Sequence, residues 1–234
     1  MKKSVVIAAA AFALAGAQAH AAVVSDCCDW SSGWTFSSYG FGVGTATATV
    51  EGSGGNPGAR LNITTHTPGA PDTAFGTAVL DSVSTPAPTS GAAFTLTLDV
   101  LSGAGAFGQG QGIQLLVEQG GSVYAMGVGI TGFPLSSFTT LNFNGNFNAG
   151  SFAKISGGGP ATPSFDGSTT TSYGFAAGNN QSGDLTQYYD NFQLTFNSGA
   201  PPASIVPVPA VSPWTLPFLG LLIAAVVFLR RRPS

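Results

Sequence analysis

Short runs of alternating apolar and polar residues fill the middle of this 234-residue chain. The clearest run, VGTATATV, spans residues 43–50, and nine more follow at 60–65, 73–80, 93–101, 112–119, 122–130, 136–143, 151–155, 169–176 and 187–196. Alternation with a period of two puts apolar side chains on one face of a β-strand and polar ones on the other. Turn-forming clusters such as GSGGNPG at 52–58 separate the runs. The pattern predicts an all-β, two-sheet β-sandwich at residues 22–198.

The first 21 residues follow a different pattern. Lys2 and Lys3 precede the apolar run 5–15, and small-x-small triplets lie at 17–19 and 19–21. A positive start, a short apolar run and a small-residue cleavage site, in that order, are typical of a secretory signal peptide. An N-terminal anchor or a buried helix is the alternative. We predict that signal peptidase removes residues 1–21, so that the mature chain begins near His20 or Ala22.

The other end of the chain has the pattern of a membrane span. Residues 199–209 are rich in proline and predict a stalk, and residues 214–229 are uncharged and strongly apolar. With the residues just before it, this run approaches the ~20 residues that a transmembrane helix needs. Trp214 suits a membrane interface, and Arg230, Arg231 and Arg232 suit the cytoplasmic side. The pattern predicts a span within 210–234, and a plain tail anchor would share it.

The segment VPAVSPW at 208–214, followed by an apolar helix and terminal arginines, resembles the C-terminal sorting signals of the PEP-CTERM class and its IPTL-CTERM variant. The chain keeps the Pro, Ser and Trp positions and departs with Ala210, Val211 and Pro213. The resemblance implies that an exosortase-type membrane protease cuts near Pro209 after a transient stay in the inner membrane. It also implies a Gram-negative bacterium that makes extracellular polysaccharide, with the product at the cell surface or in the matrix.

Charge narrows the functions open to the body of the chain. Between the two ends lie ten acidic residues and two basic ones, Arg60 and Lys154, which give a formal charge of −8. A surface of that sign repels phosphate backbones, so we exclude nucleic acid as a partner. Charged residues make up 7% of the chain, far below the ~25% of ordinary domains. Solubility must therefore come from Ser, Thr, Asn, Gln and Gly, which suits an extracellular protein.

The only cysteines, Cys27 and Cys28, are adjacent. Three interpretations stay open for an exported chain: a strained vicinal disulfide, a crosslink to a partner, or two tolerated thiols. In each case no set of disulfides staples the fold, so its stability must rest on a hydrophobic core.

Three stretches together resemble jelly-roll ectodomains of the laminin-type and galactose-binding-like kind. They are DWSSGWTFSS at 29–38, GGNPGARLNIT at 54–64 and QYYDNFQLTF at 187–196. The resemblance implies that the Trp-bearing first strand pairs with the last, which brings Asp29 near Asp190. It also implies a structural calcium ion there, held by these carboxylates. The alternative is that Asp190 caps a turn or accepts from a neighbouring backbone amide.

Catalytic groups are scarce. His66 lies in a turn-like stretch, and no histidine cluster or nucleophile motif accompanies it. A glycoside hydrolase would need two acids facing one cleft, and Glu118 is a strand residue that we expect to point outward. Exposed aromatic rings could stack on sugars instead, with Trp34, Tyr188 and Tyr189 as candidates. Tyr188 and Tyr189 are adjacent on a strand, so one of them must point outward.

These observations predict an exported, non-enzymatic surface or matrix protein, associated with biofilm or exopolysaccharide and processed at a C-terminal sorting signal. The alternative is a carbohydrate-binding module or adhesin with a structural calcium ion.

Overall fold

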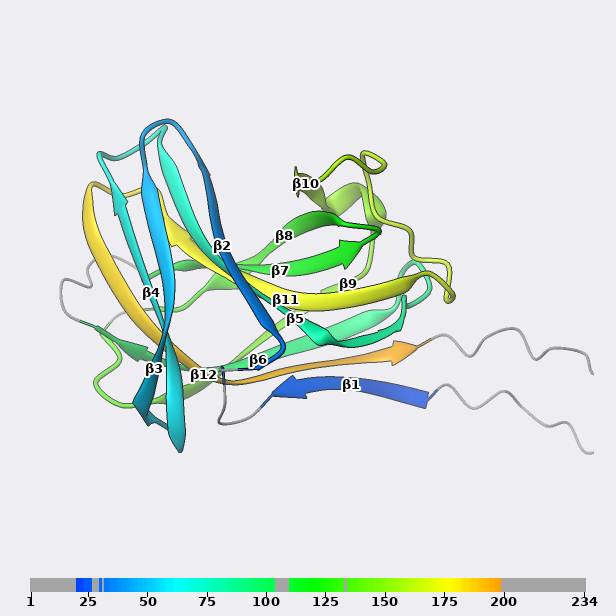
Figure 1. Cartoon of the computed structure of the whole chain (residues 1–234), viewed down its shortest axis with the longest axis horizontal. Coiled ribbons are helices and arrows are strands. Elements are labelled where there is room, and N and C mark those ends of the chain that lie inside the picture. The colour runs from blue at the N-terminus through cyan, green and yellow to red at the C-terminus, as the bar shows by residue number, and fades with distance from the viewer. Residues whose placement is uncertain (1–19, 27–29, 31, 104–109, 133, 199–234) are drawn as a thin grey trace, which may run out of the picture. The chain divides into compact units, whose positions relative to one another are not determined.

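The computed structural model describes residues 20–26, 30, 32–103, 110–132 and 134–198. Two six-stranded antiparallel sheets pack face to face (Figure 1). Sheet A has the order β3 (Thr45–Gly55), β4 (Gly58–Thr67), β12 (Gly183–Ser198), β6 (Ala93–Ser102), β9 (Thr139–Asn146), and β1 (His20–Asp26) pairs with β12. Sheet B has the order β10 (Ala153–Ser156), β8 (Ser122–Ile130), β7 (Gly112–Gln119), β11 (Thr170–Asn179), β5 (Thr73–Pro86), β2 (Trp34–Phe41). A 3-10 turn, η1, covers Ala149–Ser151.

The two-sheet all-β architecture confirms the prediction from period-two alternation. Each of the ten predicted runs corresponds to a strand, and β7 and β8 have the predicted bounds. The jelly-roll subtype of the sandwich stays a prediction.

The expectation about the first strand is wrong in one respect. The Trp-bearing strand, β2, pairs with β5 in sheet B. The strand that pairs with the last one is β1, whose residues His20–Asp26 lie opposite Phe192–Ser198 of β12. Period-two alternation is weak in HAAVVSD, because Ala21, Ala22 and Val23 are all apolar, so the pattern did not reveal this strand. The start of β1 and the end of β12 consequently lie side by side (Figure 1).

Aromatic side chains fill the space between the sheets. Trp30 is 2% exposed, and its ring centroid lies 4.7 Å from that of Trp34. At the other end of the core, Phe147 contacts the rings of Phe94, Phe165 and Phe196 at centroid distances of 5.0, 5.1 and 5.4 Å. Edge-to-face and tilted contacts of this kind add to the free energy gained by burying apolar area. All the described strands and the main core lie within residues 20–198, which form a self-contained body.

Candidate functional site: the outer face of sheet B

A lane of small residues runs along β11 in the middle of sheet B. Gly174, Ala176 and Gly178 alternate with inward-facing aromatic and aliphatic residues, so all three lie on the outer face of the sheet. Gly174 pairs with Leu116 of β7 and Val79 of β5, Ala176 with Gln114 and Thr77, and Gly178 with Gly112 and Phe75. Larger side chains on both neighbouring strands therefore border a lane that has almost none. We call the lane and its borders the sheet B groove.

The floor of the groove is apolar and buried, although it faces away from the main core. Leu116 and Ala176 are 0% exposed, and Val79 and Ala125 are 5% and 6% exposed. Partly buried side chains pack against this floor and shield it from water: Tyr39, Phe75, Val123 and Ile155. This second, small hydrophobic cluster gives the outer face a shape that a flat, solvated sheet does not have.

Two aromatic rings stand at the β2 side of the groove. Tyr39 of β2 and Phe75 of β5 are register partners, and their rings stack with a centroid distance of 5.1 Å and an interplanar angle of 11°. A Cβ atom built on Gly178 would lie 2.6 Å from the Phe75 ring, so this ring occupies the space above the lane. The Tyr39 hydroxyl donates a hydrogen bond to Gln114 of β7 and so bridges the groove. Burial raises the pKa of the Tyr39 hydroxyl, which keeps it a neutral donor.

The bridge lies between two hollows. One has a volume of about 120 Å³, and its lining includes Ser37, Thr77, Glu118 and Ile155. The other has a volume of about 210 Å³, and its lining includes Phe75, Ile130, Asn180 and Gln181. Each hollow combines apolar or aromatic surface with hydrogen-bonding groups, and this is the usual composition of a site for a small polar ligand.

Glu118 supplies the carboxyl group of the groove. Its pKa is raised, first because partial burial disfavours the charged form, and second because the neighbouring Asp81 adds negative charge and hydrogen-bonds to it. Catalytic carboxyl pairs of glycosidases lie further apart, about 5–9.5 Å, which leaves room for the sugar and water. Glu118 lines the groove on the outer face of sheet B.

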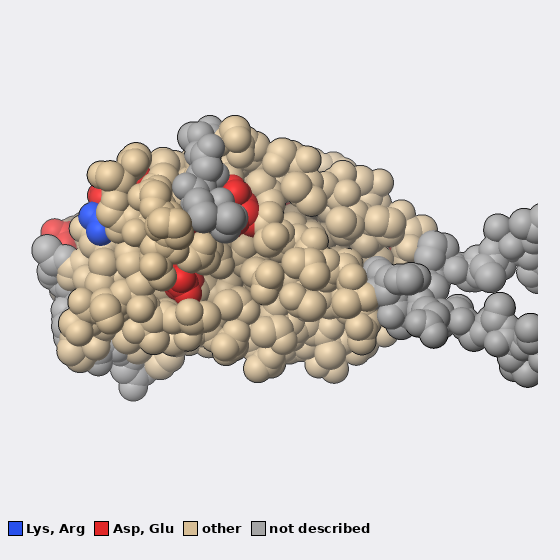
Figure 2. All heavy atoms as spheres, turned by 90° about the horizontal axis from the view of Figure 1, so that it is seen from below, with Lys and Arg blue, Asp and Glu red and all other residues tan. Residues whose placement is uncertain are grey.

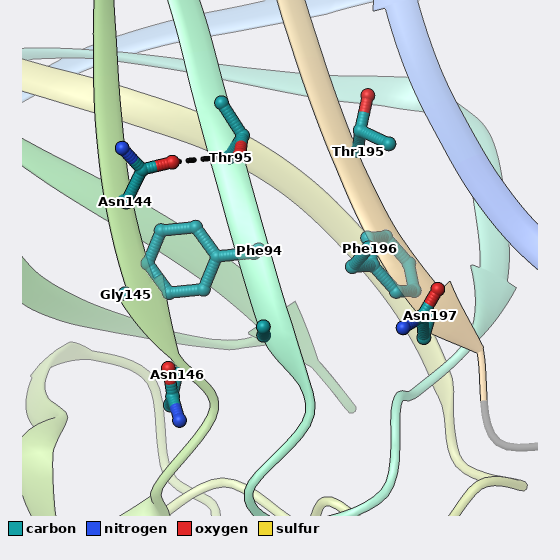
Figure 3. Close-up of a pocket in the computed structure, with 9 residues that line it drawn as sticks. Phe94, Thr95, Asn144, Gly145, Asn146, Thr195, Phe196 and Asn197 are labelled. Atoms are coloured by element: carbon teal, nitrogen blue, oxygen red, sulfur yellow. Dashed lines mark hydrogen bonds between the residues drawn. The ribbon is translucent and has the colours of Figure 1, made fainter.

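The outer face of sheet A offers a contrasting hollow, shown in Figure 3. Asn144 of β9 accepts a hydrogen bond from Thr95 of β6 at 2.7 Å, and Asn142 accepts from Thr97 at 2.8 Å. The hollow beside them has a volume of about 460 Å³ but is shallow, and the rings of Phe94 and Phe196 are buried beneath it. We call the pairs Thr95–Asn144 and Thr97–Asn142 the Thr–Asn ladder. On this side of the molecule charged groups gather toward one end (Figure 2).

Asp190 of the predicted calcium site is 0% exposed and forms hydrogen bonds with the backbone. Its Oδ1 accepts from the Asn191 amide at 2.8 Å, and its Oδ2 accepts from the Asn56 amide. Its neighbour across the sheet, Asp99, accepts from Thr140 at 2.5 Å and from the Asn191 side chain at 2.7 Å. These contacts match the alternative interpretation of Asp190, in which it accepts from backbone amides. Asp29 lies outside the described residues, so its pairing with Asp190 stays a prediction.

The three predicted sugar-stacking residues lie away from the groove. Trp34 packs against the core, with its ring 5.3 Å from that of Phe192. Tyr189 is 0% exposed and donates to Gln111 at 2.6 Å, so its ring faces the interior. Tyr188 points outward, as the alternation requires, but the Arg60 guanidinium lies 3.5 Å from its ring centroid and covers it. Tyr189 therefore has no open ring face for a sugar, and Arg60 occupies one face of the half-buried Tyr188 ring.

Several predicted features lie outside the described residues: Cys27, Cys28, Pro209, Trp214, Arg230, Arg231 and Arg232. Within the described part of the chain, no helix is long and apolar enough to cross a membrane. No group of three or more His, Cys, Asp and Glu side chains in that part is arranged to hold a metal ion.

No protein-family model matches the chain, and no curated protein matches it. Among solved structures, the family 11 carbohydrate-binding module of Lic26A-Cel5E from Clostridium thermocellum is similar at a TM-score of 0.40 and 16% identity, over 74% of this chain and 95% of that one. A structure of a family 11 module from the same organism in complex with a β-1,3-1,4-mixed-linked tetrasaccharide gives 0.40 and 16%, over 73% and 94%. The CBM22-1 xylan-binding domain of Xyn10C from Paenibacillus barcinonensis gives 0.40 and 14%, over 76% and 95%. Similarity this distant says nothing about what this chain binds, so we infer function from its own residues.

Sequence reasoning missed the groove because its parts come from different strands. Tyr39, Phe75 and Gln114 are far apart in the sequence and meet only through the pairing of β2, β5, β11 and β7. One local signal was present: in SYGFAAG, residues 172–178, every second residue is small. A strand whose outer face carries almost no side chains marks a lane between its neighbours.

Proposed function

We propose that the body of this chain, residues 20–198, is a non-catalytic module that binds a neutral polysaccharide in the sheet B groove. The observation that carries the proposal is the stacked pair Tyr39 and Phe75 beside a lane of small residues on β11. Sugar rings have apolar faces that pack on aromatic rings, and hydroxyl edges that bond to neutral polar groups. The groove offers Gln114, Thr77 and Asn180 as such groups.

Charge favours a neutral polysaccharide over an acidic one. In the described part of the body the bases are Arg60, which pairs with Glu51 at 2.6 Å, and Lys154, which donates to the Gly159 carbonyl at 2.9 Å. The groove itself carries a carboxyl group from Glu118. An anionic chain would be repelled by this carboxylate, and neither of the two bases lines the hollows of the groove.

The absence of catalysis is part of the proposal. Asp81 is the carboxyl group that raises the pKa of Glu118, by its charge and by a hydrogen bond, whereas the carboxyl pair of a glycosidase must leave room for a sugar and a water between its members. The pair is better suited to accept and donate hydrogen bonds to ligand hydroxyl groups. We expect no release of reducing sugar from any polysaccharide that the module binds.

The test is affinity electrophoresis of residues 20–198 through gels that contain neutral or acidic polysaccharides, followed by calorimetry with oligosaccharides. We expect retardation by at least one neutral polysaccharide, and at least tenfold weaker binding for Tyr39→Ala. The matched control is Asn144→Ala, which removes a polar side chain from the Thr–Asn ladder and should bind as the wild type does. Failure to bind any neutral polysaccharide, or equal loss in both variants, would overturn the proposal.

We also propose that the module is exported and sorted as its termini predict. The support is the sequence alone: residues 1–21 have the order of a signal peptide, and residues 208–234 resemble an exosortase signal. Intact mass measured on the protein from its native host tests this. A mature chain that starts near residue 20 or 22 and ends near Pro209 is expected, and retention of Arg230–Ser234 would contradict it.

A further inference from the structure

β2 is an open edge of sheet B. In the part of the chain that the structure describes, its ladder pairs it with β5 alone, so the other side of this eight-residue strand has no strand partner. β3, which follows it through a tight turn, is likewise an edge of sheet A. Backbone N–H and C=O groups on such edges are templates for another strand.

This edge lacks the features that normally prevent pairing. Between Trp34 and Val50 there is no charged residue and no proline. Natural edges are commonly protected by lysine, proline or an inward-pointing charge. The turn between the two strands also exposes Phe41 and Val43, which are 73% and 74% exposed. They are two of the four large hydrophobic residues that are exposed in the described part of the body.

We propose that a second copy of the chain pairs with β2 in an antiparallel, two-fold symmetric contact. A strand edge is complementary to another strand, and a two-fold axis makes the same edge serve both partners. The body carries a formal charge of −8, so two copies repel one another over most of their surface. The run 34–50 has no charge of its own, and the carboxylates of Asp26 and Asp72 lie at its two ends, beside Trp34 and Gly42, so a second copy can approach along the middle of β2.

Pairing of this kind has a consequence for the groove. If the two-fold axis runs perpendicular to the plane of the joined sheet, the outer faces of sheet B in the two copies point to the same side. Ser37 and Tyr39 of β2 lie at the groove, so the two grooves would lie next to each other on one continuous face. A dimer would then present two sites to one polysaccharide, and binding would gain from multivalency. This last step rests on the proposed function, whereas the dimer itself does not.

Light scattering coupled to size-exclusion chromatography of residues 20–198, over a wide range of concentrations, tests the dimer. We expect a monomer–dimer equilibrium that Ser38→Lys weakens at least tenfold, since it puts a charge on the exposed edge. The control, Ser151→Lys, adds the same charge in η1, next to β10 at the opposite edge of sheet B. A wild-type protein that stays monomeric throughout, or a dimer equally weakened by both variants, would refute the edge pairing.

Hydrogen exchange of the unmodified protein gives a second readout that does not depend on a variant's folding. We expect the amides of residues 34–41 to gain protection as the dimer forms, and protection confined to other segments would overturn the assignment. For the joined grooves, retention on a dense polysaccharide should rise more steeply than monovalent oligosaccharide binding as the dimer forms. If retention on the polysaccharide and binding of the oligosaccharide rise equally, only the joining of the two grooves is contradicted. A lack of oligosaccharide binding at every concentration contradicts the proposed function and leaves the dimer standing.

Discussion

The outer face of sheet B buries Leu116 and Ala176 completely, whereas the outer face of sheet A turns threonine and asparagine to water. Both faces come from strands with the same alternation, and both lie on the outside of one sandwich. They differ in what stands beside the outward residues. On sheet B, Tyr39 and Phe75 lean over a lane without side chains, and on sheet A neighbouring side chains of similar size pair with one another. Outward position on a strand therefore does not imply solvation, and a face that hides apolar surface has more to offer a ligand.

The largest expected difference between the faces is in stability. Leu116→Ala should lower the free energy of unfolding by about 2–5 kcal/mol, because it leaves a cavity in a fully buried cluster. Thr97→Ala in the Thr–Asn ladder should cost about 0.5 kcal/mol or less, since its hydrogen bond is exposed. Urea unfolding of residues 20–198 measures both values. Equal losses would mean that the floor of the groove is not packed as the structure shows.

Asp190 lies at the centre of a buried polar cluster in sheet A, which contrasts with the solvated outer face of that sheet. Asp190→Ala should cost about 1–3 kcal/mol, because it removes a buried carboxylate that accepts hydrogen bonds from the backbone amides of Asn56 and Asn191. If these amides alone hold the carboxylate, added calcium should leave the melting temperature of the wild type unchanged. Calorimetry with calcium and with a chelator checks this, and a calcium-dependent rise in melting temperature would instead support the predicted calcium site.

Removing a single hydroxyl group from each outer face should also have different effects on stability. Tyr39→Phe removes the bridge to Gln114 and should destabilise the body by about 0.5–1.5 kcal/mol while keeping the aromatic ring. Thr95→Val removes the corresponding hydroxyl from the Thr–Asn ladder, where water replaces it at almost no cost. Thermal unfolding of the pair distinguishes a bridge that closes the groove from a surface contact. A Tyr39→Phe variant as stable as Thr95→Val would show that the bridge contributes nothing.

The smallest expected effect is on how the free energy of unfolding depends on pH. The pKa of Glu118 lies above its ordinary value of 4.5, so the folded protein holds this proton more tightly than the unfolded chain does. The resulting stabilisation is present at low pH and is lost as the pH rises from about 4.5 through the raised pKa. Because Glu118 is only partly buried and water screens its charge, we expect less than about 1 kcal/mol. Glu118→Gln should flatten the stability profile above pH 4.5, and an unchanged slope would contradict the assignment.

Two other carboxyl groups act in the opposite direction. Hydrogen bonds from Thr169 and Ser168 hold the pKa of Asp166 well below its ordinary value, and Asn62 lowers that of Glu51. Their contributions are lost as the pH falls, below the range in which Glu118 acts. The Glu118 effect can therefore be measured separately, from about pH 4.5 upward.

The strands were predictable because their signal is local. Each run from 43–50 onward carries its own period-two pattern, and a strand with one apolar face must bury it against another layer. β1 escaped prediction because its four consecutive apolar residues, 21–24, lack alternation and because its pairing with β12 spans most of the chain. The sugar-stacking candidates show the limit of such reasoning at a site. Tyr188 and Tyr189 were correctly expected to face opposite ways, but the cover that Arg60 places over Tyr188 comes from another strand.

Alternation and composition are properties of the chain alone, so they were enough to predict the class of fold, the net charge and the scarcity of catalytic groups. The place where a ligand could bind emerged from the folded sheets. The order of β2, β5, β11 and β7 brings two rings, a glutamine and a lane of small residues together, and no residue in that set is unusual in its own strand. Strand order depends on contacts between residues far apart in the chain, which a local pattern does not encode.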